Sequence, residues 1–463
     1  MDGSIIDNAG DDFSISLPQP EFSNIDEIDS CLLRSAYSFS VKQRLVQQIL
    51  DDGFIPKLFE IFRMSEDLEN SENLFKLFSI FRSIVLLNNS MLLSELMSEE
   101  HILDFVGIFE HDPNFPNLKP GFRDYMRGEN LFKELVTITD ANILNLIHTT
   151  FRAQYLKDVV LARILDDETF STFTFLIRTF QRSIVEELQT NPDFMQQLLP
   201  LLDSNDKATL KNVISFLKEY FSIAKTVPGS NIFKSIEAKK LLNFIIRCLR
   251  DHEGLDLMEL TEILVHLIEF DCGKAREMMI KSDNELILFP QIIEGFNNNE
   301  SMGIKLQFSQ IIRLLCEPSI AVDNNRKLEE FLNVVYPVYS AELFKPFLDI
   351  KCLDAESANL LMDLLSSFIK FHKFRAKYLI IGSSILNNVA RFMYRDVKYL
   401  NLAALRVLRT VLSCQDNYYH RFVVKHNLLE PLISLAKREE GKDNLLSSAV
   451  LEYFQFIISV ILC

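Results

Sequence analysis

A short apolar pattern, which returns at nearly regular intervals, constrains the fold of this chain most strongly. Its eight copies start at Ile55, Ile102, Met195, Leu242, Phe289, Leu332, Leu386 and Leu429. Successive starts are 47, 93, 47, 47, 43, 54 and 43 residues apart, and the step of 93 is close to two periods. Apolar residues at i, i+3 and i+4 within each copy indicate one buried face of a helix. A period of about 40–47 residues is typical of HEAT and armadillo repeats.

A second amphipathic segment accompanies these octets, with examples at 73–87, 211–224, 257–270, 358–371 and 402–413. Neither helix of such a pair can bury its apolar stripe alone, so neighbouring units must stack and share a core. In the last unit a short segment around 418–424 lies between the long segment and the octet, which is the order of an armadillo unit. We therefore predict an all-α fold, an armadillo/HEAT-like α-solenoid superhelix with an irregular insertion in the N-terminal third.

The insertion is the stretch in which the period is lost. It opens with HDPNFPNLKPGFRDYM (111–126), which holds three of the 14 prolines. Proline lacks an N–H and biases its predecessor away from helix, so these residues predict an enforced helix stop. Residues 1–30 contain eight acidic residues and no Lys or Arg. We predict an acidic disordered tail at 1–24, helical repeats at 25–109, an irregular block at 110–172, and armadillo/HEAT-like repeats at 173–463.

The sequence offers little for catalysis or cofactor binding. Only 13 residues are Gly, there is no GxxxxGK[ST], GxGxxG, GxSxG or HExxH motif, and the seven Cys form no CxxC pair. We therefore predict no catalytic residues, no cofactor and no metal, and a chain that is not an enzyme. The net charge of −16 would repel a nucleic-acid duplex, so nucleic acid is not expected as a partner. No apolar run approaches the length of a membrane span, so we expect no membrane partner.

Charge is unevenly distributed along the repeats. Residues 251–300 carry a net charge of −9, whereas residues 370–409 carry +8. Because the planar guanidinium of Arg binds phosphate through two hydrogen bonds, we predict that the basic segment binds acidic or phosphorylated protein segments. The candidate residues, called the basic cluster, are Lys373, Arg375, Arg391, Tyr394, Arg395, Lys398, Arg406 and Arg409. The alternative is that these are ordinary solvated helix faces whose charges pair within the chain.

The irregular block is a second candidate binding region, because an aperiodic insertion can specify something other than stacking. Its candidate residues are Phe115, Phe122, Tyr125, Arg152, Tyr155 and Lys157. The three rings at 115, 122 and 125 either fill the joint between repeats or are offered to a partner. We favour filling.

Several of these stretches resemble a known family. HDPNFPNLKPGFRDYM, NLFKELVTITD and IHTTFRAQYLKDVVLARILDDETFSTF resemble the SMEK domain of the protein phosphatase 4 regulatory subunit 3 family, and the last repeat resembles its last armadillo unit. The resemblance runs from about residue 24 to residue 463. It implies a non-catalytic scaffold that binds the phosphatase catalytic subunit and a second regulatory subunit. It further implies recruitment of phosphoprotein substrates, including DNA-damage-response proteins, in the nucleus and cytoplasm.

Two parts of the family pattern are not found in this sequence. Family members carry an N-terminal EVH1-like domain that docks FxxP-type motifs, and an acidic tail after the repeats. We therefore expect this chain to correspond to the helical core of a longer protein, and we assign no FxxP recognition to it. The alternative function is a general armadillo-type adaptor or transport solenoid that binds peptide segments. Carriers of basic signals use a ladder of Trp and Asn, and this chain has no Trp.

Overall fold

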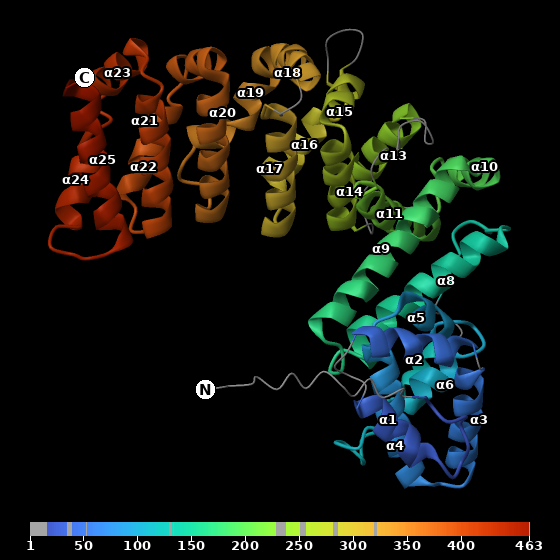
Figure 1. The fold of residues 1–463 in the computed structure, drawn as a ribbon. Helices are drawn as coiled ribbons and strands as arrows, with labels where there is room; N and C mark the ends of the chain where they lie inside the picture. Colours follow the sequence, from blue (N-terminus) through green and yellow to red (C-terminus); the bar gives the residue numbers. More distant parts are fainter. Residues whose placement is uncertain are drawn as a thin grey trace, which may run out of the picture. The chain divides into compact units, whose positions relative to one another are not determined.

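The structure is a computed structural model that describes residues 16–34, 39–51, 53–128, 132, 134–227, 238–250, 256–280, 286–318 and 322–462. These residues form helices joined by loops, and within the described ranges the only β-type pairing is an isolated bridge between Ile280 and Leu286. The predicted all-α fold is confirmed. The chain divides into two compact units, Met1–Phe194 and Met195–Cys463 (Figure 1).

The N-terminal unit begins with helices that follow the predicted repeats. They are α1 (Ile25–Arg34), α2 (Phe39–Asp51), α3 (Phe54–Asp67), α4 (Ser71–Leu86), α5 (Ser90–Leu96) and α6 (Ile102–Ile108). The first two octets lie in α3 and α6, which both pack on α4. Phe81 of α4 lies between Phe59 and Phe105, at ring-centroid distances of 5.0 and 5.9 Å. These rings form a buried core that the helical spacing of the octets predicts.

The segment before α1 corrects part of the predicted disordered tail. Leu17 is buried, and its backbone N–H donates to Gln48 Oε1 of α2 at 3.2 Å. Asn24 Nδ2 donates to Gln19 O at 2.8 Å, which closes a turn just before α1. Residues 16–24 are thus packed against the helices that follow them, because Leu17 supplies apolar area to bury. Residues 1–15 of the predicted tail lie outside the described residues.

The irregular block contains α7 (Phe122–Met126), α8 (Ala141–Tyr155) and a π-helix, η2 (Leu156–Val160), and it ends in α9 (Asp167–Thr190). Side-chain caps start the longer helices, since Asp140 accepts from Ile143 N and Asp166 accepts from Thr169 N. Among residues 111–121, which contain the three prolines, the structure has turns and no helix. The predicted boundary at residues 172 and 173 falls inside α9, so the block and the following repeat share one helix. Residues 129–131 and 133 of the block lie outside the described residues.

In the C-terminal unit the octets and the long helices alternate. The octets lie in α10 (Pro192–Leu201), α13 (Ala238–Arg250), α16 (Phe289–Asn298), α18 (Val322–Val334) with the π-helix η3 (Val335–Tyr339), α21 (Ile385–Arg391) and α24 (Glu430–Arg438). The long helices are α11 (Lys207–Ala224), α14 (Leu257–Phe270), α17 (Met302–Cys316), α20 (Ala355–Ile381), α22 (Lys398–Ser413) and α25 (Leu445–Leu462). Shorter connecting helices are α15 (Cys272–Met279), α19 (Ser340–Leu343), η4 (Lys345–Leu348), η5 (Phe392–Tyr394) and α23 (Asn417–Lys425). The last of these confirms the short helix predicted around 418–424.

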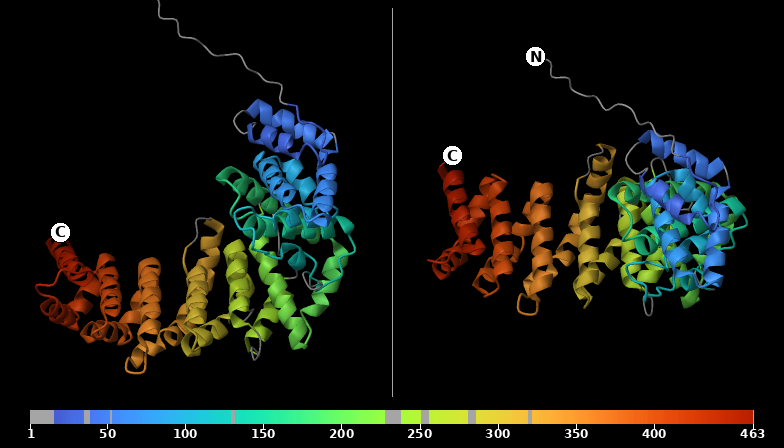
Figure 2. Two further views of the ribbon diagram at one scale, coloured as in Figure 1. Left: turned by 90° about the horizontal axis from the view of Figure 1, so that it is seen from below. Right: turned by 60° about the horizontal axis from the view of Figure 1, so that its bottom comes forward.

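The long helices stack in sequence order within this unit. Each packs on the next, from α11 through α14, α17, α20 and α22 to α25. Figure 2 shows α14 to α25 side by side, in the colours from yellow-green to red. Because each inner long helix buries one stripe on the preceding long helix and another on the following one, the core runs continuously through the unit. This stacking is the helical-repeat solenoid that the period predicts.

Arginines at the ends of octet helices join successive repeats. Arg247 donates to the carbonyl of Ser204 at 3.1 Å and also to that of Leu202, both just after α10. The last carbonyls of a helix have no partner within it, so a guanidinium from the next repeat can satisfy several at once.

The same arrangement recurs later in the unit. Arg395 donates to the carbonyls of Ile350 and Leu353. Arg438 donates to the carbonyl of Met393 at 3.3 Å. The separations in sequence are 42 to 45 residues, which is one repeat.

Candidate functional site

The residues of the basic cluster are spread over α20, α21, η5 and α22. Arg395 lies near the start of α22, where it donates to the carbonyl of Leu353 at 3.4 Å. Lys377, which lies beyond Arg375 in α20, contacts Asp416, three residues after the end of α22, through a 2.8 Å ion pair. The two ends of this 16-residue helix are about 24 Å apart. The structure therefore does not bring the eight residues together as one site.

Intramolecular pairs engage several of these residues. The ion-pair distances are 2.8 Å from Arg375 to Glu329, 2.6 Å from Arg406 to Asp363 and 2.7 Å from Arg409 to Glu452. Arg391 donates weakly to Asn388 Oδ1 at 3.4 Å, and Tyr394 is 49% exposed. Exposed pairs contribute at most about 1 kcal/mol each, so they position the side chains more than they stabilise the fold. Within the described ranges, Lys373 and Lys398 are exposed and have no ion-pair partner.

Lys373 occupies a kink in the longest helix. Its backbone has φ 22° and ψ −80° in the middle of α20, a conformation that costs free energy for any residue other than Gly. The preceding residue, His372, is buried; its Nε2 donates to the carbonyl of Cys316 at 2.7 Å, and its Nδ1 accepts from the Tyr336 hydroxyl at 2.9 Å. Burial lowers the pKa of His372, which favours the neutral ring that this bonding requires. The kink is thus fastened to both α17 and η3.

An open groove of about 540 Å³ lies between η3 and the part of α20 that follows the kink. Its apolar and aromatic lining includes Leu332, Tyr336, Pro337, Phe374, Tyr378 and Leu379. Phe374 and Tyr378 are 67% and 64% exposed, and their rings meet edge to face at 4.9 Å. Sequence reasoning missed these two rings, although the alternation of basic and aromatic residues in KFHKFRAKY (370–378) was an available signal.

The aromatic residues of the irregular block correct the filling interpretation. Phe115 is 47% exposed beneath the guanidinium of Arg163, and Tyr125 is 51% exposed. Tyr125 stacks on Tyr155 with a centroid distance of 4.8 Å. Only Phe122 packs against the core as predicted, while remaining partly accessible. Filling is therefore wrong for Phe115 and Tyr125, because the first ring packs under Arg163 and the second on Tyr155 while about half of each side chain stays exposed.

The remaining predicted residues of the block have structural contacts. Arg152 is 9% exposed and donates to the carbonyl of Met97 at 3.2 Å. Burial lowers the pKa of this guanidinium. Lys157 pairs with Asp158 at 2.7 Å and lies 4.8 Å above the ring of Phe170.

The proline-containing loop is anchored by a group of charged residues that sequence reasoning did not single out. We call Glu66, Glu110, His111 and Arg123 the carboxylate cluster. Arg123 donates to both oxygens of Glu66 at 2.8 and 2.9 Å and, through Nε, to Glu110 at 2.8 Å. His111 Nε2 lies 3.2 Å from Glu66 Oε1. Glu66 lies in the last turn of α3, so the cluster holds both ends of the loop against that helix.

The geometry of the carboxylate cluster sets its electrostatics. Burial raises the pKa of Glu66, but hydrogen bonds from His111 and Arg123 outweigh that effect and lower it to about 2. Arg123 also lies over Gly107, where an added Cβ would stand 2.9 Å from its Cδ. The cluster pairs its charges within the unit, so it forms an anchor and leaves little to offer a ligand.

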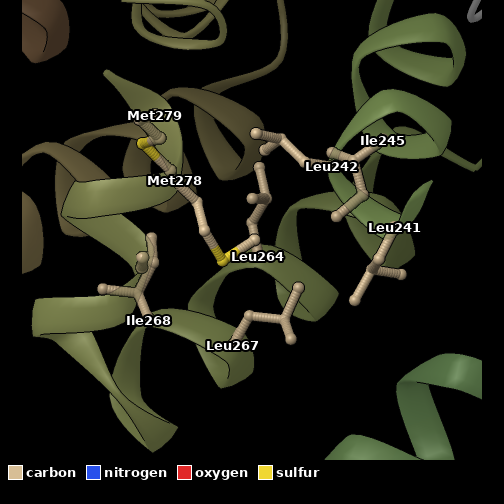
Figure 3. Close-up of a pocket in the computed structure, with 9 residues that line it drawn as sticks. Leu241, Leu242, Ile245, Leu264, Leu267, Ile268, Met278 and Met279 are labelled. Carbon is tan, nitrogen blue, oxygen red and sulfur yellow. The ribbon is translucent and has the colours of Figure 1, made fainter. Parts of the chain in front are cut away.

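A small cavity between α13, α14 and α15 is a packing void. Figure 3 shows its lining of leucine, isoleucine and methionine side chains, and its volume is about 20 Å³. A water molecule would find no polar partner there, so the cavity is expected to stay empty. Among the described residues no group of His, Cys, Asp and Glu has the arrangement of a metal site. In those same ranges, no helix is both long enough and apolar enough to span a membrane.

Comparison with known proteins decides the family. The family model described as phosphatase 4 regulatory subunit 3 matches residues 27–460, which cover most of both units of the structure. The chain belongs to the phosphatase 4 regulatory subunit 3 family. The resemblance of the block and of the last repeat is thereby confirmed, and the family's description as a regulatory subunit agrees with the prediction that this chain is not an enzyme.

Three similar proteins come from different organisms. The chain is 27% identical to serine/threonine-protein phosphatase 4 regulatory subunit 3 of Drosophila melanogaster and 26% identical to Suppressor of Mek1 of Dictyostelium discoideum. It is 28% identical to an uncharacterised protein of Schizosaccharomyces pombe. Each alignment covers 96% of this chain, but 47%, 45% and 58% of the respective relative. The chain therefore spans about half the length of the curated relatives it matches.

Proposed function

We propose that this chain is the helical scaffold of a phosphatase 4-type assembly, where it binds the catalytic subunit and a second regulatory subunit. The observation that supports this most strongly is the family match from residue 27 to residue 460. A stacked helical array suits this role, because it exposes a long surface on which several proteins can bind at once.

The scaffold would bring phosphoprotein substrates to the catalytic subunit through acidic or phosphorylated segments, including segments of DNA-damage-response proteins. Tethering raises the local substrate concentration to the order of millimolar, which speeds dephosphorylation without any catalytic group on the scaffold. Such targets place the assembly in the nucleus as well as the cytoplasm.

Reconstitution from purified proteins tests the proposal. The chain is immobilised and exposed to the phosphatase 4 catalytic subunit, with and without the second regulatory subunit. We expect the catalytic subunit to be retained in at least one arm, and no phosphopeptide hydrolysis by the chain alone. Retention in neither arm, together with retention of nuclear transport factors, would instead support the alternative of an armadillo-type carrier.

A further inference from the structure

We propose that the groove between η3 and the kinked end of α20 is a docking site for an acidic protein segment that carries one large apolar side chain. The proposal names the place where acidic segments of the proposed function would bind, and to that extent it rests on that function.

The first argument is the exposure of two large rings at one end of a hollow. Phe374 and Tyr378 are 67% and 64% exposed, whereas most of the large apolar side chains of the unit are buried in its stacked core. Both rings line the groove, together with Leu332, Tyr336 and Leu379. Aromatic side chains beside a pocket dominate the binding energy of many protein interfaces. An apolar side chain of the partner would fill the hollow between the rings and η3.

The second argument is that both walls of the groove are irregular. One wall is the π-helix η3, which supplies Tyr336 and Pro337. The other follows the kink at Lys373, whose φ of 22° is unusual for a residue with a side chain. π-helical turns and unfavourable backbone conformations occur preferentially at functional sites, because they place side chains where a regular helix would not. The bond between Tyr336 and His372 fixes the two irregularities to each other.

The third argument is the charge along the rim, which decides the chemistry of the occupant. Residues 370–378 contain four basic residues and no acidic residue. Arg375 pairs with Glu329 and Lys377 with Asp416. In the described parts of the chain, Lys370 and Lys373 are exposed and have no carboxylate partner.

Lys373 directly precedes Phe374, which lines the groove, and Lys370 lies in the turn before the kink. No acidic side chain lines the groove itself, and Arg375 is the charged residue among its described lining. The surplus of positive charge therefore favours an acidic occupant over a neutral or basic one.

Fluorescence polarisation with defined probes tests the proposal. The probes are four fluorescein-labelled peptides in which Phe, Leu, Tyr or Met stands between three acidic residues on each side. We expect at least one of them to bind the wild-type chain about tenfold more tightly than its counterpart with Gln in place of every acidic residue. Changing the central residue to Ser should weaken binding by about tenfold. Equal binding of the Gln peptides, or no binding of any acidic peptide, would overturn the proposal.

Variants of the chain assign that binding to the groove. Phe374→Ser is expected to weaken it by about tenfold. Phe175→Ser, which changes a ring that is 69% exposed on α9, is the matched control and should leave it unchanged. Lys373→Glu should weaken it by about threefold and reduce its dependence on salt. Equal effects of Phe374→Ser and Phe175→Ser would contradict the assignment. If a fluorescein-labelled polythymidine strand binds more tightly than any peptide, the occupant of the groove is a nucleic acid and the proposed protein partner is wrong.

The docking proposal and the scaffold proposal can be contradicted independently. If the Phe374→Ser variant no longer binds the acidic peptide but still binds the phosphatase catalytic subunit, both proposals are supported. If the wild-type chain binds the peptide and retains no phosphatase subunit, the proposed function fails while the groove stands.

Discussion

Arg123 of the irregular block and the arginines that end octet helices in the C-terminal unit are held by different acceptors. In the repeats, Arg247, Arg395 and Arg438 donate to backbone carbonyls at the end of the preceding repeat. In the block, Arg123 donates to the carboxylates of Glu66 and Glu110. Both arrangements cross-link segments that are distant in sequence.

Carboxylate pairs also join repeats, since Arg406 pairs with Asp363 and Arg409 with Glu452 across 43 residues, but the two kinds of contact make different demands on the sequence. Every helix end offers carbonyls whatever its sequence, so a single arginine per period suffices to repeat the contact. A carboxylate pair needs an acidic residue at a matching position, so each pair has to be specified by the sequence. The block also has one carbonyl contact of the repeat type, from Arg152 to Met97. Carbonyls do not titrate and carboxylates do, so the two kinds of anchor should respond differently to pH.

The largest effect is expected at Arg276, which is fully buried in α15. It donates to the carbonyls of Leu315 and Glu317 at 2.8 and 2.7 Å, at the end of α17. Arg276→Met leaves these buried acceptors unpaired, so we expect the free energy of unfolding to fall by about 3 kcal/mol in urea titrations. Arg326→Met, whose side chain is 81% exposed, is the control and should cost less than about 0.5 kcal/mol. Equal losses would show that the carbonyl contacts do not hold the repeats.

A smaller, pH-dependent effect is expected in the carboxylate cluster. The pKa of Glu66 is about 2 in the folded chain, against 4.5 for an ordinary Glu. A carboxylate with a lowered folded pKa stabilises the fold fully above its unfolded pKa, and that contribution disappears as the pH falls from about 4.5 towards 2. Glu66→Gln should therefore cost about 2 kcal/mol at pH 7 and much less at pH 3, measured by urea unfolding of the N-terminal unit.

The exposed Glu60 on the same helix provides the control for that change. Glu60→Gln should alter the stability by less than about 0.5 kcal/mol at either pH. A loss from Glu66→Gln that stayed constant between pH 7 and pH 3 would mean that its charge is not what anchors the loop.

The next effect tests how tightly Arg123 is held. An added Cβ at Gly107 would stand 2.9 Å from Arg123 Cδ and Nε. Because Glu66 and Glu110 fix that side chain, Gly107→Ala should cost about 1–2 kcal/mol in thermal unfolding. In an Arg123→Met background the cost should shrink, since the replacement has no carboxylate partners and can move aside. An undiminished cost there would place the strain elsewhere.

The smallest effect concerns the kink in α20. Glycine adopts positive φ without a Cβ clash, so Lys373→Gly should stabilise the chain by about 0.5–1 kcal/mol. Lys370→Gly, one turn earlier in regular helix, should destabilise it by about 1 kcal/mol. The two stability changes are measured as shifts in the urea midpoint. A gain for Lys373→Gly and a loss for Lys370→Gly would confirm the strained backbone. Two losses of equal size would exclude it.

Periodicity predicted the stacked helices because burial at i, i+3 and i+4 is written into each octet. It could not predict η3, because LNVVYPVY (332–339) has the same apolar spacing as octets that form α-helix. The groove depends on that π-helix and on the kink, so the apolar periodicity cannot predict it. The pairing of Glu66 with Arg123 spans 57 residues without any repeating register. Backbone carbonyls carry no sequence signal, so the sequence predicts a ligand-binding role for Arg395, whereas the structure shows that it links two repeats.

Hydrogen exchange at pH 7, followed by mass spectrometry in wild-type chain and in Glu66→Gln, tests the different anchoring of the two regions most directly. Faster exchange is expected in peptides from α6 and α7, because the carboxylate cluster holds the loop that joins them. Peptides from α13 to α25 should exchange as in the wild type, since carbonyl-bound arginines hold those repeats. Unchanged exchange in the block would contradict the proposed difference in anchoring. Faster exchange that spreads into the C-terminal repeats would contradict it as well.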